Sequence, residues 1–177
     1  FDRRIGDGCL YCHVGRIAEA GRGRDVHRLE PFAEAGIGCE RCHGPGEEHV
    51  ALWRSGGPAP DATDPIVSLA SLDSDRRDAI CFSCHLQGRL TLRRFGREFF
   101  DFRPGDLLED TLLVYLDDER LDANTAIVPV SQVEQMIVSR CYQASGGELG
   151  CIPCHDPHRM PTSPTRVAFY RGRCLEC

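Results

Sequence analysis

Cysteine pairs followed at once by histidine are the residues best suited to chemistry in this chain. The stretch Cys39-Glu40-Arg41-Cys42-His43 sets two thiols three positions apart and places an imidazole directly after the second. Each thiol can form a thioether with one vinyl group of a haem, and the histidine can then reach the iron from the same side. The spacing therefore predicts a covalently attached c-type haem, with His43 as the proximal ligand.

The complete motif occurs four times along the chain. Its copies comprise Cys9, Cys12 and His13; Cys39, Cys42 and His43; Cys81, Cys84 and His85; and Cys151, Cys154 and His155. Cys174 and Cys177 stand at the same spacing, and we expect them to hold a fifth haem whose histidine follows in a longer chain. A disulfide between these two cysteines is the open alternative. The predicted cofactor is thus haem c, in four to five copies.

Zinc is the main alternative to haem, because repeated C-x-x-C pairs also build zinc ribbons. The chain has 7 histidines among its 177 residues. The odds that four of them follow four such pairs by chance are on the order of 10⁻⁶. A structural zinc site needs no histidine at that position. Haem therefore explains the pattern better than zinc or a redox dithiol does.

Three further histidines are candidates for distal ligands of iron: His27, His49 and His158. Gly44-Pro45-Gly46 turns the chain after His43, so we expect His49 to reach the iron of a different haem. His27 could instead be a surface histidine in an Arg-rich loop, and His158 could be a hydrogen-bonding loop histidine.

Five haems would require ten axial ligands, whereas the chain offers seven histidines. At least one iron must therefore lack a second histidine from this segment. Met136 could ligate through its thioether, although methionine on a helix is more often a core residue. Cys141 lies outside every motif, and we expect it to be a buried free thiol.

Composition limits both the core and the partners. Aromatic residues make up only 7% of the chain, so haem macrocycles are expected to fill much of its core. The net charge is −6, which argues against nucleic acid as a partner. All 21 basic residues are arginine, which suits clamping of haem propionates or reflects coding bias. No apolar run reaches membrane-span length.

The local pattern predicts a mainly α fold with little regular secondary structure. Helices are expected over 46–54, from a cap at Asp73 or Ser74 to His85, from a capping box at 131–134 through Cys141 to the glycines at 146–147, and over 165–177. Residues 89–102 predict a β-hairpin that turns at Gly96. The stretch 107–116 is ambiguous between strand and helix. We expect one domain over 1–177, with a haem-free insert at 86–140.

Three stretches carry a resemblance to a known group. The pattern C-x-x-C-H-G-P-G-x-x-H at 39–49, the helix end at 139–142 and C-x-x-C-H-D-P-H at 151–158 resemble bacterial multihaem cytochromes c. The chain resembles domains related to the tetrahaem electron carrier of ammonia oxidisers, which are often joined to tetratricopeptide repeats. This resemblance implies closely packed haems in stacked and perpendicular pairs. The same superfamily contains hydroxylamine oxidoreductase and octahaem reductases, so it does not separate carriers from enzymes.

Two functions are compatible with these motifs. The first is electron transfer to and from other redox proteins or cytochromes, with a homo-oligomer or haem filament as one form. The second is oxidation or reduction of small nitrogen or sulfur compounds at an iron with an open position. No catalytic trio is visible, so a carrier is favoured over an enzyme. Because bacteria attach c-type haem outside the cytoplasm, we expect an exported protein, periplasmic or extracellular.

Overall fold

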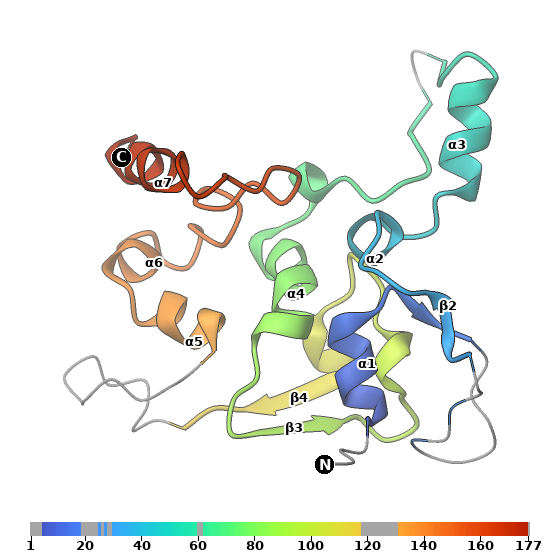
Figure 1. Ribbon diagram of the computed structural model, residues 1–177, viewed down its shortest axis with the longest axis horizontal. Coiled ribbons are helices and arrows are strands. Elements are labelled where there is room, and N and C mark those ends of the chain that lie inside the picture. Colours follow the sequence, from blue (N-terminus) through green and yellow to red (C-terminus); the bar gives the residue numbers. More distant parts are fainter. Residues whose placement is uncertain are drawn as a thin grey trace.

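Short helices and two small sheets, joined by long irregular segments, make up the structure (Figure 1). It is a computed structural model that describes residues 5–18, 25, 27, 30–59, 62–117 and 131–176. The helices are α1 (Asp7–His13), α2 (Glu40–His43), α3 (Glu47–Arg54), α4 (Ser74–His85), α5 (Gln132–Ile137), α6 (Arg140–Ala144) and α7 (Arg166–Leu175). Single 3₁₀ turns cover Leu69–Ser71, Phe99–Asp101 and Leu108–Asp110. The prediction of a helix-rich fold with little regular structure is confirmed.

Both sheets are two-stranded and antiparallel. Strand β1 (Arg16–Ile17) pairs with β2 (Phe32–Glu34), and β3 (Leu90–Arg93) pairs with β4 (Leu112–Tyr115). The predicted hairpin within 89–102 is therefore only half right, because β3 forms but its partner is β4. Residues 99–101 form a 3₁₀ turn instead, capped by reciprocal hydrogen bonds between Glu98 and Asp101. The ambiguous stretch 107–116 divides into a 3₁₀ turn and a strand.

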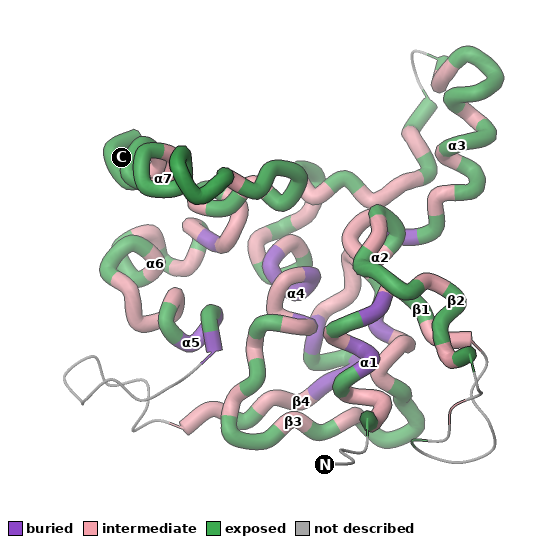
Figure 2. Tube along the Cα trace, viewed as in Figure 1, coloured by how far each residue is buried: buried purple, intermediate pink, exposed green. Residues whose placement is uncertain are grey.

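A small apolar core lies where α1 and α4 meet the segment 99–112. Its buried members are Tyr11, Ala79, Ile80, Phe102, Leu108 and Leu112. Figure 2 shows the buried positions concentrated on α1, α4, α5 and the strand beside them. Residues from the cysteine-free segment 86–140 thus supply part of the main core.

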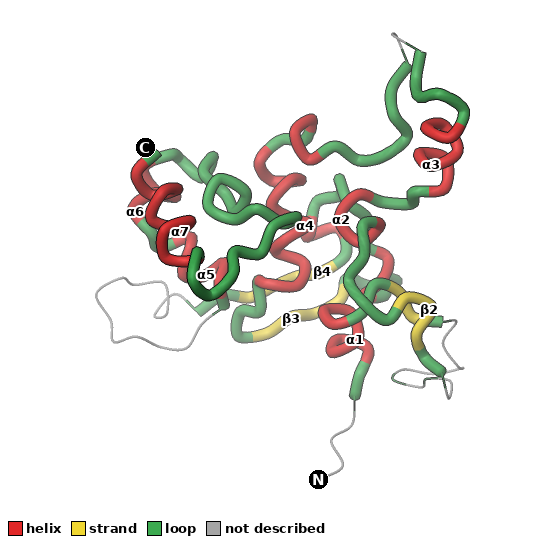
Figure 3. The backbone as a smooth tube through the Cα atoms, turned by 45° about the horizontal axis from the view of Figure 1, so that its top comes forward, coloured by secondary structure: helices red, strands yellow, loops and turns green. Residues whose placement is uncertain are grey.

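The outer helices bury little. Helix α3 projects away from the body, and α5, α6 and α7 form a separate group beside α4 (Figures 1 and 3). As described, α2, α3, α6 and α7 contain no buried residue. Isolated helices this short are marginal in water, so these helices need partners to be stable. None of the helices in the described ranges combines the length and apolar character that a membrane crossing requires.

The helix starts predicted from the sequence match the structure better than the predicted helix ends do. Asp73 caps α4 by accepting a hydrogen bond from the Arg76 backbone N–H at 2.9 Å. The predicted capping box at the start of α5 also forms, with Glu134 accepting from the Ser131 backbone N–H at 2.8 Å. The single helix expected from there to Gly146 is wrong, because Ser139 caps a second helix, α6, through the Tyr142 N–H.

Candidate haem-attachment sites

Two of the four complete motifs lie on helices that form the core. Helix α1 carries Cys9, Cys12 and His13, and the last turn of α4 carries Cys81, Cys84 and His85. Residues three and four positions apart share one face of an α-helix. Each helix therefore presents both thiols and the histidine on the same side, as attachment of one haem requires.

The other two motifs form single helical turns. The His43 N–H donates to the Cys39 carbonyl at 2.9 Å, and the His155 N–H donates to the Cys151 carbonyl, also at 2.9 Å. Gly44 then leaves α2 with φ of +77°, a conformation that side-chain-bearing residues rarely adopt. All four motifs thus share one local geometry despite different surroundings.

Helix α4 is the place where the motifs meet. The Cys12 Sγ lies 3.9 Å from the Cys84 carbonyl oxygen, and the Cys84 Sγ lies 4.0 Å from the Tyr11 carbonyl oxygen. At the other end of the same motif, the thiols of Cys81 and Cys151 interact directly. Cysteines from the first and fourth motifs therefore flank the third.

These thiol contacts change the acidity of the cysteines. The Cys12 thiol donates to Cys84, which lowers the pKa of Cys84 to about 5 and raises the pKa of Cys12. The Cys151 thiol likewise lowers the pKa of Cys81 by hydrogen bonding, and its own pKa is raised. Burial raises the pKa of Cys42, which lies near both α4 cysteines. The thiolate is the nucleophilic form of cysteine, so each contact favours reaction at one sulfur of its pair.

The residues inside the motifs hold two sites together. Arg41 lies between the cysteines of the second motif and Tyr11 between those of the first. The Arg41 Nη2 donates to the Tyr11 carbonyl at 2.8 Å, and its guanidinium carbon lies 4.2 Å from the centre of the Tyr11 ring. This cation–π contact fixes α2 against α1. Arg41 is therefore engaged with protein groups and is a poor candidate for clamping a propionate.

The imidazole of His43 is oriented by the backbone. Its Nδ1 lies 2.8 Å from the carbonyl oxygen of Val67, which can only accept a hydrogen bond. Nδ1 therefore carries the proton, and Nε2 keeps a free lone pair. Metal-ligating histidines usually have this arrangement, because the bond at one nitrogen fixes the tautomer and the ring for the other.

His49 is oriented in the same way by a carboxylate. Its Nδ1 lies 2.6 Å from Asp64 Oδ1, and the Trp53 indole N–H donates to Asp64 Oδ2 at 2.8 Å. The hydrogen bonds from Trp53 and from His49 lower the pKa of Asp64. Asp64 thus stays ionised and holds the Nδ1 proton, which again leaves Nε2 for a metal.

The remaining histidines have different surroundings. The Nε2 of His27 lies 3.6 Å from Asp7 Oδ1, so a carboxylate already faces the nitrogen that the other two leave available. His155 makes an edge contact with Tyr170 of α7, with ring centroids 5.5 Å apart. His13 and His85 are exposed at the ends of α1 and α4. His158 lies against His43, with ring centroids 5.9 Å apart.

Cys141 and Met136 occupy positions near the fourth motif. Cys141 is exposed on α6, so the expectation of a buried thiol is wrong. The reason is that α6 buries no residue. Met136 is half-buried, and its Sδ lies 4.0 Å from the Cys151 Sγ. Cys174 is exposed on α7, whereas Cys177 lies outside the described residues.

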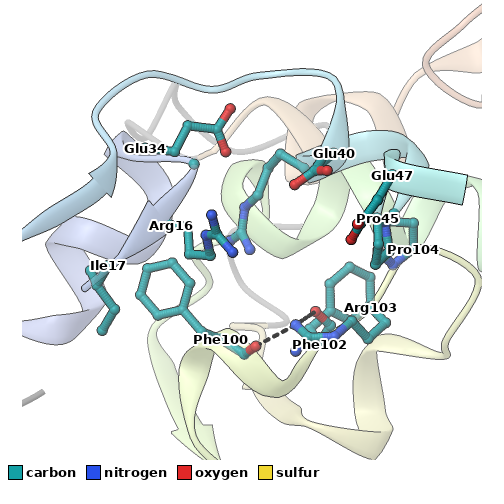
Figure 4. A pocket seen from close by; sticks show the side chains of 13 residues that line it. Arg16, Ile17, Glu34, Glu40, Pro45, Glu47, Phe100, Phe102, Arg103 and Pro104 are labelled. Carbon is teal, nitrogen blue, oxygen red and sulfur yellow. Dashed lines mark hydrogen bonds between the residues drawn. The ribbon is translucent and has the colours of Figure 1, made fainter. Parts of the chain in front are cut away.

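A cavity of about 350 Å³ opens beside the turn that follows α2 (Figure 4). Arg16, Glu34 and Glu40 line one side, and Phe100, Phe102 and Arg103 line the other. The Arg103 Nη1 donates to the Phe100 carbonyl at 2.6 Å, the dashed contact in the figure. Among the arginines that line the cavity, Arg16 is the one without a partner in the described hydrogen bonds. Its guanidinium is therefore a better candidate than Arg41 for binding a haem propionate.

The donor geometry fits haem better than zinc. Across the described ranges, no three His, Cys, Asp or Glu side chains converge into a metal-binding group. A structural zinc site needs four ligands around one point. Cysteine pairs on helical turns, together with the fixed Nδ1–H of His43 and of His49, are instead what binding of a c-type haem requires.

Comparison with known proteins agrees with this interpretation of the motifs. A family described as cytochrome c554 and c-prime matches residues 2–44. The chain is 23% identical over 180 residues to a multihaem cytochrome, MtrA, from Shewanella baltica. It is 27% identical over 169 residues to a C-type polyhaem cytochrome, OmcB, from Geobacter sulfurreducens. The chain is similar to bacterial multihaem c-type cytochromes.

The similarity covers most of this chain but less of its relatives. The alignments span 97% and 81% of this chain, against 52% of the Shewanella protein and 20% of the Geobacter protein. The chain thus spans about half the length of one relative and about a fifth of the other. No solved structure gives a significant match.

Sequence reasoning located the thiols and histidines but missed the groups that orient them. Val67 lies 24 residues after His43, and Asp64 lies 15 residues after His49. A backbone carbonyl leaves no signal in a sequence. An aspartate and a tryptophan near an unassigned histidine are a weak signal that could have directed attention to Asp64.

Proposed function

We propose that this chain transfers electrons through four covalently bound c-type haems that are arranged around helix α4. The observation that carries the proposal is the meeting of motif cysteines at α4, where Cys84 contacts the first motif and Cys81 the fourth. A c-type haem supplies a one-electron ferric–ferrous couple. Anchoring sulfurs this close together bring the attached edges of neighbouring haems together.

The proposed anchors are the eight cysteines of the complete motifs, and the proposed proximal ligands are His13, His43, His85 and His155. His49 is proposed as a distal ligand because Asp64 prepares its Nε2, as Val67 does for His43. His27 has less support, because its Nε2 faces Asp7.

The small core supports haem as a structural component. Large apolar side chains stay exposed on helices that bury nothing, among them Trp53, Val167 and Leu175. Haem macrocycles beside α3 and α7 would cover such side chains and add apolar burial at roughly 25 cal/mol per Å².

We further propose a fifth haem on Cys174 and Cys177. The pair has the spacing of the other four, and α7 presents Cys174 to solvent. Thioether links on both sulfurs would support this proposal, whereas alkylation of both thiols by iodoacetamide would contradict it.

The proposed cofactor determines the expected cellular location. Covalent haem attachment outside the cytoplasm implies a periplasmic or extracellular protein with other redox proteins as partners. The proposed likeness to the tetrahaem carrier of ammonia oxidisers rests on the stretches 39–49, 139–142 and 151–158. A haem filament remains a second form of the same function.

Small ligands distinguish the carrier from an enzyme. The ferric protein is titrated with cyanide, nitrite and hydroxylamine while its absorption spectrum is followed. A carrier with most irons ligated on both sides stays largely low-spin and turns over none of these compounds. Turnover of nitrite or hydroxylamine would replace the proposal with the oxidoreductase alternative.

A further inference from the structure

Two histidines far apart in the sequence lie side by side. The ring centroids of His43 and His158 are 5.9 Å apart, and their planes are within 9° of parallel. His43 belongs to the second motif, whereas His158 follows the fourth motif by three residues. Local chain geometry does not bring these residues together, so their approach is a tertiary feature.

The spacing matches that of two imidazoles on opposite sides of one iron. With metal–nitrogen bonds of about 2 Å on each side, the two ring centres lie roughly 6 Å apart. An aromatic contact between the rings could have a similar spacing, since such pairs span about 4.5–7 Å. The separation alone therefore does not decide between the two.

The surroundings of each ring favour ligation. Val67 holds the Nδ1 proton of His43, so Nε2 is available as a ligand. The His158 backbone is held by its N–H, which donates to Asp156 Oδ1 at 3.0 Å, and Pro157 restricts the turn between them. His158 is exposed, so burial of an aromatic pair is not what fixes its place.

We propose that His43 and His158 are the two axial ligands of one iron, that of the haem anchored by Cys39 and Cys42. This assignment rests on the proposed function. It also places the second and fourth haems next to each other, because His155 and His158 then serve neighbouring irons from one short turn.

The test combines two variants of the haem-loaded protein. His158→Ala is expected to convert one haem per chain from low-spin to high-spin. Cys39→Ser with Cys42→Ser removes the haem in question, and adding His158→Ala to that variant is expected to create no further high-spin haem. His49→Ala is the matched control, since it should create a high-spin haem in both backgrounds.

Two results would overturn the assignment. One is an unchanged spin state in His158→Ala, which would mean an aromatic contact only. The other is that His158→Ala creates the same amount of high-spin haem whether or not the haem on Cys39 and Cys42 is present. The intact mass of each variant counts haems independently, so a failure of covalent attachment is distinguished from a wrong ligand.

A second readout does not depend on the double cysteine variant. Near-parallel imidazole planes give a rhombic low-spin electron paramagnetic resonance signal, whereas perpendicular planes give a highly anisotropic one. The signal lost between the unmodified protein and His158→Ala is expected to be rhombic, in line with the 9° angle. Loss of a highly anisotropic signal would contradict the assignment.

Discussion

Single hydrogen bonds decide which histidine nitrogen faces a metal in this protein. A carbonyl holds Nδ1 of His43 and a carboxylate holds Nδ1 of His49, whereas His27 has Nε2 beside Asp7. The first two are therefore prepared to bind iron through Nε2. A carboxylate partner also makes an imidazole a stronger electron donor to the iron, which stabilises the ferric state.

Asp64→Asn is expected to raise the reduction potential of the haem that His49 ligates. The amide carries no charge, so His49 becomes a weaker donor and the ferric state loses stabilisation. A spectroelectrochemical titration measures the shift as an upward move of one haem's midpoint. Asp110→Asn, an exposed aspartate outside the haem motifs, should leave all midpoints nearly unchanged. A downward shift or equal shifts in both variants would contradict the role of Asp64.

At the scale of elements, Arg77 holds α4 to the segment before the fourth motif by a hydrogen bond, and it forms an ion pair with its neighbour Asp78. Arg77 donates to both oxygens of Asp78 at 3.1 Å and, through Nη2, to the Glu148 carbonyl at 3.1 Å. The Asp78 side chain is only 5% exposed. The hydrogen bond to Asp78 raises the pKa of Arg77.

Arg77→Ala is expected to lower the free energy of unfolding by about 3–5 kcal/mol, because it leaves the Asp78 carboxylate buried and unpaired. Denaturant unfolding followed by circular dichroism measures the loss. Arg76→Ala removes the neighbouring arginine, which pairs with the exposed Asp73, and should cost much less. Equal losses in the two variants would mean that the buried pair has no special role.

The cap of α4 predicts a pH dependence. Hydrogen bonds from the Arg76 backbone N–H and then from its side chain lower the pKa of Asp73. A carboxylate whose folded pKa is depressed stabilises the fold above its unfolded pKa, and this contribution disappears as the pH falls through the folded pKa. Asp73→Asn keeps a capping oxygen but does not titrate.

The thermal midpoint of Asp73→Asn should therefore lie below that of the unmodified protein at neutral pH. The gap should close below about pH 4. Asp75→Asn, on the same first turn, controls for the loss of charge. A gap that stays constant from neutral to acid pH would contradict the role of the Asp73 charge.

Local signals in the sequence predicted the elements that depend on neighbouring residues. The Asp73 cap, the Ser131–Glu134 box, α3 and α7 all follow from residues within one turn of each other. The partner of β3 could not be predicted in this way, because Leu112 to Tyr115 lie across an intervening turn and pair through backbone groups. The break between α5 and α6 was missed because Ser139 can either cap a helix or lie within one.

The residues of the candidate site likewise divide into those that local sequence predicts and those that it does not. Cysteine and histidine spacing defined the motifs, since the chemistry of attachment is local. The partners Val67, Asp64 and Arg41 act across tertiary contacts, so they became visible only in the structure. The same is true of the approach of His158 to His43.

For the whole molecule, the arrangement around α4 makes its haem the central one. Removing it with Cys81→Ser and Cys84→Ser is expected to slow electron exchange between the first haem and the adjacent second and fourth haems by at least about tenfold, a rise in activation free energy of about 1.4 kcal/mol. Pulse reduction followed by absorption measures the exchange. Removal of the first haem with Cys9→Ser and Cys12→Ser should leave the others coupled. A larger effect of the second change would contradict a central role for α4.

The number of covalently bound haems tests the central claim most directly. Intact mass of the denatured protein, expressed in a host that attaches c-type haem, is compared with the pyridine haemochrome content per chain. Four complete motifs predict at least four haems per chain that survive acid extraction, and a fifth on Cys174 and Cys177. Fewer than four covalent haems, or bound zinc in their place, would contradict a multihaem electron carrier.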